Sequence, residues 1–148
     1  MQHGISSFWQ RLIRNNESGS VLVEFALLAP AYMTLLMGVF QVGAWVQNYN
    51  AVRNLTADGA RFAVVQYQRG NALTTVQMES YLRARGIGDT YHLNTDRLGT
   101  TVTQETSRIA GVTEMSIRIS YAPPDWLAFV DGETLTIVYE RPVFLLIP

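Results

Sequence analysis

The sequence predicts an α+β fold, in which a long N-terminal helix continues into a small domain with a short helix and a three- or four-stranded antiparallel sheet. Residues 21–46 form an almost unbroken apolar run. Apolar residues then recur at three- and four-residue steps as far as Tyr67, which is typical of an amphipathic helix. Further along, "EMSIRISYA" and "TLTIVYE" alternate apolar and polar side chains, as half-buried strands do.

The apolar run predicts a transmembrane helix over residues 20–46. Between residues 21 and 46 only three side chains are polar: Glu24, Thr34 and Gln41. As a helix the run is about 39 Å long, and a hydrocarbon core of ~30 Å needs less. The alternative is the core helix of a soluble protein, but a helix of this length would then show a polar stripe. Pro30 removes one backbone hydrogen bond and predicts a local kink.

The flanks of this run predict its orientation. Arg11 and Arg14 precede it against the single acid Glu17, and the first basic residue after it is Arg53. Because basic residues favour the cytoplasmic side, we expect a cytoplasmic N-terminus and an extracytoplasmic domain over residues 47–148. A cleaved secretory signal is the alternative, but the run is longer than the ~7–15 apolar residues of such signals.

The helix is expected to continue beyond the membrane and to stop at Arg69-Gly70-Asn71. Arg53, Arg61 and Arg69 recur every eight residues and predict a solvated stripe. The small residues of "ADGA", at 57–60, allow a close approach of another element. A second helix is predicted over residues 72–85, with four inward side chains: Leu73, Val76, Tyr81 and Leu82. Two ion pairs are expected on these helices, Asp58–Arg61 and Glu79–Arg83.

Residues 86–99 are expected to form a loop, because "GIGDTYHLNTDRLG" is rich in turn residues. Strands are predicted over residues 100–106, 114–122 and 134–140. In the last of these Leu135, Ile137 and Tyr139 would share one face. Pro142 follows and indicates an edge strand or a bend, since proline cannot donate to a strand ladder.

The composition predicts no enzyme. The 148 residues carry a net charge of −1, which offers no electrostatic surface for nucleic acid. Without cysteine the chain has no disulfide and no thiolate metal site. His3 and His92 stand in no metal-ligand spacing, and no catalytic motif is present. We therefore expect no cofactor, no metal, no catalytic residue and no small-molecule substrate.

The stretch "GSVLVEF" holds a carboxylate, Glu24, near the start of the apolar helix and five residues after Gly19. It resembles the processing site of type IV pilin-like proteins, in which a prepilin peptidase cuts after a glycine. The resemblance implies that residues 1–19 are a cytoplasmic leader, cleaved before Ser20. It also implies that the new Ser20 amine pairs with Glu24 of a neighbouring subunit. In the alternative, Glu24 only extends to the lipid headgroups.

The longer stretch "GSVLVEFALLAPAYMTLLMGVFQVG" is similar to the TadE-like family of the tight-adherence (Tad) pilus system. Eight residues fit its signature: Gly19, Val23, Glu24, Phe25, Ala26, Pro30, Gly38 and Gly43. A second piece, "TADGARFAVV", resembles the family's small-residue stretch with an arginine-aromatic pair, here Arg61 and Phe62. The sizeable domain favours the minor pseudopilin branch over the short major pilins, and a pilin-like fold.

The resemblance implies a single-pass protein of the bacterial inner membrane with a periplasmic C-terminal domain, which would reach an extracellular pilus if it polymerises. The implied partners are the prepilin peptidase, other Tad pilins and pseudopilins, the inner-membrane assembly platform and membrane lipid. The alternative function is a periplasmic adaptor or sensor that never polymerises. Four aromatic residues are candidate subunit contacts, although the last three could also pack on the sheet: Phe25, Trp126, Phe129 and Phe144.

Overall fold

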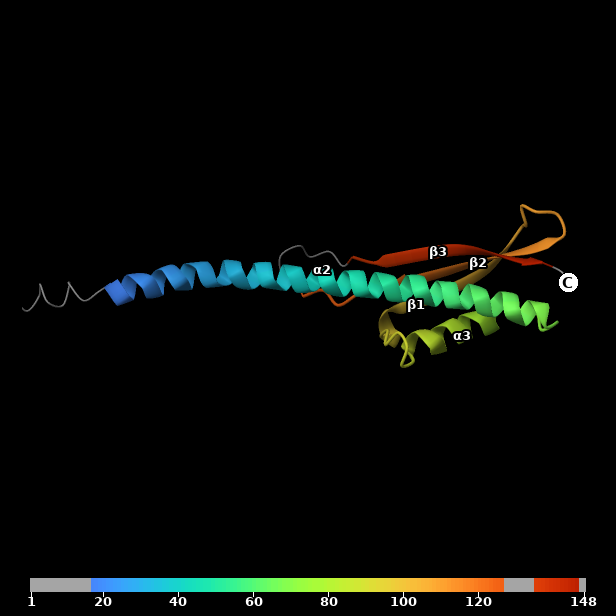
Figure 1. Cartoon of the computed structure of the whole chain (residues 1–148), viewed down its shortest axis with the longest axis horizontal. Coiled ribbons are helices and arrows are strands. Elements are labelled where there is room, and N and C mark those ends of the chain that lie inside the picture. The colour runs from blue at the N-terminus through green and yellow to red at the C-terminus, as the bar shows by residue number, and fades with distance from the viewer. Residues whose placement is uncertain (1–16, 127–134, 147–148) are drawn as a thin grey trace, which may run out of the picture. The chain divides into compact units, whose positions relative to one another are not determined.

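A computed structural model of the chain describes residues 17–126 and 135–146 (Figure 1). The predicted fold class is confirmed: the described part holds a long apolar helix, a short helix and a three-stranded antiparallel sheet. The chain divides into two compact units, with the boundary between Phe40 and Gln41. The domain limits predicted at residues 19 and 46 stay predictions.

Helix α2 covers Glu17–Gln68 and contains Pro30. It ends where predicted, because Gly70 adopts a left-handed φ of 74° that only glycine accepts without strain. The N–H of Gly70 donates to the carbonyl of Tyr67 at 3.0 Å, and that of Asn71 to Gln66 at 3.0 Å. These bonds satisfy carbonyls that the end of a helix leaves without partners. The three arginines of the predicted stripe are all exposed.

Helix α3 covers Thr75–Ile87, so the predicted start at residue 72 was three residues early. A capping box sets the start. The Thr74 hydroxyl accepts from the Gln77 N–H, and the Gln77 side chain accepts from the Thr74 N–H at 2.9 Å. The inward face was also partly wrong, since Val76 is exposed. The face buries residues spaced by four: Met78, Leu82 and Gly86.

The sheet has the order β1-β2-β3 and both pairings are antiparallel. Its strands are β1 (Leu98–Glu105), β2 (Val112–Tyr121) and β3 (Ile137–Leu146). A 3-10 turn, η1, covers Thr95–Arg97. The predicted loop over residues 86–99 is therefore shorter at both ends, since α3 reaches Ile87 and β1 begins at Leu98.

Strand β3 runs through Pro142 to Leu146 and lies at an edge of the sheet, as the proline predicted. A proline is tolerated there because the strand has a neighbour on one side only. Leu135 lies before the strand and is exposed, so the predicted strand start at residue 134 was three residues early. Ile137 is buried and Tyr139 is half-buried, so these two residues share the inward face of β3.

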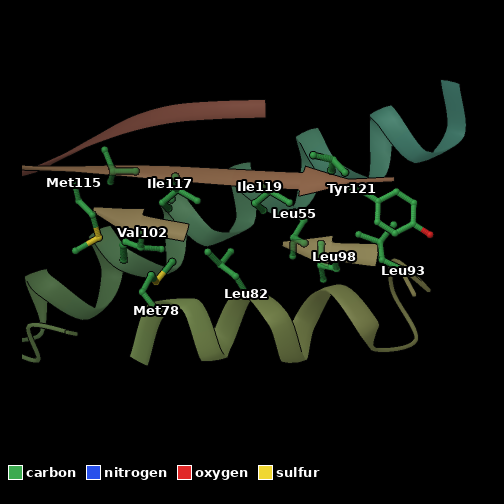
Figure 2. Packing of buried hydrophobic residues seen from close by; sticks show 14 of the residues in the cluster. Leu55, Met78, Leu82, Leu93, Leu98, Val102, Met115, Ile117, Ile119 and Tyr121 are labelled. Carbon is green, nitrogen blue, oxygen red and sulfur yellow. The ribbon is translucent and has the colours of Figure 1, made fainter. Parts of the chain in front are cut away.

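The hydrophobic core lies between the sheet and the helices of residues 41–146, and Figure 2 shows its central part. Met115, Ile117, Ile119 and Tyr121 alternate along β2 and all are buried. Met78 and Leu82 extend from α3 toward β1, where Val102 and Leu98 meet them. The Phe62 ring of α2 stacks on Tyr81 with 3.8 Å between centroids.

The small residues of α2 allow α3 to come close, as predicted from "ADGA". A Cβ built on Gly59 would overlap the Leu82 side chain, at a distance shorter than real Cβ contacts. It would also lie 3.3 Å from the Met78 Cε. Gly86 of α3 likewise leaves space for a side chain of α2, since a Cβ there would lie 2.9 Å from Leu55 Cδ2. The two helices therefore approach each other at positions where one of them has no side chain.

Candidate functional site

The predicted processing site lies in the first turn of α2. Gly19 and Ser20 follow Glu17, where the helix begins, so the bond between them is helical in the uncut chain. The first four N–H groups of a helix lack partners within it, and helix ends fray easily. Ser20 and Glu24 are four residues apart and lie on one face of the helix.

Glu24 is exposed and surrounded by exposed apolar side chains on the same helix. Its carboxylate has no hydrogen-bond or ion-pair partner in the part of the chain that the structure describes. No residue of α2 between positions 20 and 46 is buried. An ionised group in such an apolar setting costs several kcal/mol at membrane depth unless something compensates it.

The other two polar side chains of the apolar run are satisfied. The Thr34 hydroxyl donates to the Pro30 carbonyl one turn earlier at 2.8 Å. Gln41 uses both ends of its amide: Nε2 donates to the Pro124 carbonyl at 3.1 Å, and Oε1 accepts from the Trp126 N–H at 3.0 Å. Of the three, Glu24 is thus the one whose charge needs a partner from outside the described residues.

Pro30 lies inside α2, and the helix is continuous through it. Its ring leaves the carbonyl one turn earlier without a donor. The nearby Thr34 bond satisfies the carbonyl of Pro30 itself, not the one that the proline frees. The predicted kink at this residue stays a prediction.

The candidate subunit contacts differ in exposure. Phe25 is 69% exposed on the apolar helix, and Trp126 is 50% exposed at the end of the segment that follows β2. Phe144 is half-buried on β3, and the Arg108 guanidinium lies 5.5 Å from its ring centroid. Phe129 lies outside the described residues. A cation–π contact already covers Phe144, which makes it the least available of the three described.

A groove of about 410 Å³ lies between α2 and the free edge strand β3. Val64, Val65 and Pro142 supply apolar walls, and Arg61 and Arg141 also line it. Neither guanidinium has a hydrogen-bond or ion-pair partner among residues 17–126 and 135–146. The opposite edge of the sheet is covered, because the Glu79 carboxylate of α3 accepts from the Val102 N–H at 2.8 Å.

Two predicted ion pairs were therefore wrong. Glu79 accepts a hydrogen bond from the backbone of β1 and does not pair with Arg83. The Arg83 guanidinium donates to the Thr95 carbonyl at 3.3 Å. Asp58 accepts from the Tyr91 hydroxyl at 2.7 Å in place of pairing with Arg61. Burial, and then this hydrogen bond, raise the pKa of Tyr91 to about 12. Local spacing along a helix could not show these partners, which come from distant segments.

A second, polar groove of about 560 Å³ adjoins the Asp58–Tyr91 pair. Side-chain amides of α2 and the loop residue His92, which has a φ of 52°, line it. Within the described ranges no group of three or more His, Cys, Asp and Glu side chains is placed to hold a metal ion. The groove therefore offers hydrogen-bonding groups and no recognisable reactive centre.

These features define an α+β protein with a helix near its N-terminus that is long and apolar enough, by length and composition, to cross a membrane. The chain is thus compatible with a single-pass membrane protein.

Residues 19–61 match the family model described as TadE-like protein, which confirms the predicted resemblance over this segment. The matched segment is less than half of the chain and ends inside α2. It links the chain to the Tad pilus system in general. Searches of curated proteins and of solved structures found no match.

Proposed function

We propose that this chain is a minor pseudopilin, which helps to prime, stabilise or cap a Tad (Flp type IVb) pilus or a related secretion filament. The observation that carries the proposal is the carboxylate of Glu24, which has no partner among the described residues and lies five residues after Gly19 on an exposed apolar helix. Both residues lie within the segment that matches the TadE-like family.

Cleavage between Gly19 and Ser20 would supply the missing partner for Glu24. The new α-amine would lie one turn from Glu24 on the same face, at the positive end of the helix dipole. Within one subunit the amine and the carboxylate are both costly at the membrane edge. Between subunits each charge offsets the desolvation of the other, and the contact sets the axial position of one helix against the next.

The proposal assigns the chain to the bacterial inner membrane, with a cytoplasmic N-terminus and a periplasmic domain. Its partners would be a prepilin peptidase, the other pilins and pseudopilins, the inner-membrane assembly platform and lipid. The groove beside β3 adds support. Within the described part of the chain, β3 is an edge strand and both arginines of the groove lack an ion-pair partner, so another subunit could add a strand there. We assign the chain no catalytic activity and no cofactor.

The decisive experiment separates processing from assembly. In cells that carry the rest of the Tad system, Glu24→Leu should be cleaved, inserted and stable, because Glu24 lies beyond the scissile bond. Piliation and co-purification with the other pilins should be lost. Removing one half of a desolvated ion pair costs ~3–5 kcal/mol. Because the membrane edge is partly hydrated, we expect the loss of association free energy to lie at or below the lower end of this range. Even ~1.4 kcal/mol weakens an association tenfold.

Thr34→Val is the matched control, because it removes a polar group of the same helix whose hydroxyl, among the described residues, bonds to the helix's own backbone at Pro30. Its piliation should equal that of the native chain. Mass spectrometry of the membrane-purified protein tests the leader: the native chain should begin at Ser20, and Gly19→Leu should keep residues 1–19. Normal piliation with Glu24→Leu, or an uncut native chain, would favour the adaptor or sensor that never polymerises.

A further inference from the structure

One side chain of α2, that of Gln41, makes two hydrogen bonds to the segment after β2. Gln41 binds the Pro124 carbonyl and the Trp126 N–H, so its amide pairs with the chain as a neighbouring strand would. No regular element contains residues 122–126, and their backbone groups need partners from elsewhere. Gln41 therefore holds the backbone of Pro124 and Trp126 beside its own turn of α2.

The position of Gln41 along the chain then becomes informative. It directly follows Phe40, the last residue of the first compact unit. Residues 20–40 would form a helix of about 31 Å, which equals the ~30 Å thickness of a hydrocarbon core. The helix in this range exposes its apolar side chains. If that range spans the bilayer, as the proposed function requires, Gln41 falls at the outer boundary of the hydrocarbon.

The side chains next to Gln41 suit such a boundary. Trp126 is 50% exposed, and Trp45, one turn after Gln41, is 36% exposed and stacks on Tyr49 with 5.6 Å between centroids. Val42 and Val46 are exposed beside them. Tryptophan prefers the membrane–water interface, because its ring is apolar and its indole N–H needs a polar partner. Contact with water alone is unfavourable for these exposed aromatic and valine side chains, because they are largely apolar.

We propose that Trp45 and Trp126 form an aromatic collar that binds the headgroup layer of the outer leaflet. Gln41 places the two residues at the same position along α2, because it precedes Trp45 by one turn and bonds to the backbone of Trp126. The occupant of this surface is lipid, since the exposed apolar helix continues directly into it. The hydrocarbon span then ends at Phe40, six residues before the limit expected from the sequence, and Gln41 never enters the hydrocarbon. The inference rests on the proposed membrane topology and adds the depth at which the domain is held.

Tryptophan fluorescence of the full-length protein in phosphatidylcholine vesicles tests the collar. Trp9→Phe with Trp45→Phe leaves Trp126 as the single fluorophore, and Trp9→Phe with Trp126→Phe leaves Trp45. The lipids carry bromine either close to the headgroup or close to the end of the acyl chain. Both fluorophores should be quenched strongly by the shallow bromine and weakly by the deep one.

Gln41→Ala should release Trp126 and abolish its quenching, while Trp45, which α2 itself holds, stays quenched. Thr34→Val is the matched control and should change neither. A Trp126 that is quenched by neither lipid, in protein that remains in the membrane after carbonate washing, overturns the collar alone. Release of the native chain by carbonate overturns the proposed membrane span, and the collar with it. Unchanged quenching of Trp126 in Gln41→Ala overturns the role given to the glutamine.

Discussion

Gly59→Ala tests the close approach of α2 and α3 most directly. The added Cβ would overlap the Leu82 side chain and press on Met78 Cε at 3.3 Å. Both partners are fully buried, so neither has open space to move into. The substitution therefore sets a favourable local effect against an unfavourable packing effect.

The two effects have comparable sizes. Alanine is better than glycine inside a helix by ~0.8–1.0 kcal/mol. Overpacking a well-filled core costs typically ~1–3 kcal/mol. The net change should be a destabilisation of about 0–2 kcal/mol, which lowers the melting temperature by a few degrees for a domain of this size.

Gly43→Ala is the matched control, because it makes the same substitution in the same helix where a Cβ meets nothing within 4 Å. Since the propensity gain is shared, the difference between the two variants isolates the packing cost and should be ~1–3 kcal/mol. Thermal unfolding of the full-length protein in detergent micelles, followed by near-ultraviolet circular dichroism, measures both.

A second substitution checks that Leu82 is the obstacle. Leu82→Val alone should destabilise by creating a small cavity, at about 0.5–1.5 kcal/mol. Combined with Gly59→Ala, it should cost less than the sum of the two, because the shorter side chain vacates the space that the new methyl needs. If Gly59→Ala stabilises the protein as much as Gly43→Ala does, the reasoning about helix contact is refuted.

Three further predictions concern single interactions. Thr74→Ala should destabilise the domain by about 0.5–2 kcal/mol in guanidinium unfolding, because it removes the N-cap of α3. Tyr91, whose pKa is raised from 10.0 to about 12, should make stability fall between these pH values, because the unfolded chain ionises first. Tyr91→Phe should remove that part of the pH dependence, as measured by unfolding at each pH. The Arg108 side chain donates to Glu114 and lowers the pKa of that carboxyl. The pair therefore stabilises the fold fully above the ordinary pKa of glutamate. This stabilisation is lost as the pH falls through the lowered pKa. Glu114→Gln should flatten this acid limb; an unchanged acid limb would contradict the assignment.

Element type followed from local patterns. The alternation of Met115, Ile117, Ile119 and Tyr121 predicted β2 and its inward face correctly. The glycine after α2 and the proline in β3 were placed correctly because each acts through its own backbone restriction. The predicted start of α3 was three residues early, although both residues of the capping box that sets it, Thr74 and Gln77, are visible in the sequence.

The partners of polar side chains were not predictable in this way. Asp58 and Glu79 each have an arginine at helical spacing, yet Tyr91 and the Val102 backbone bind them. Gln41 was recognised only as a polar residue in an apolar run, and its partners lie 83 and 85 residues away in the chain. Periodicity describes which face of an element is apolar; it does not contain the identity of the element that meets that face.

The sequence by itself determined the long apolar helix, the stop at Gly70, the alternating strands and the Gly19–Glu24 spacing, which lies within the segment that matches the TadE-like family model. Each of these depends on residues close together in the chain, whose backbone restrictions and periodicity act locally. Tertiary structure alone decided that Gly59 would face Leu82, that Glu79 would cover one edge of the sheet, and that Gln41 would hold the segment at Trp126. These contacts depend on the packing of distant segments, because a buried polar group bonds with whichever donor or acceptor the folded chain brings within reach.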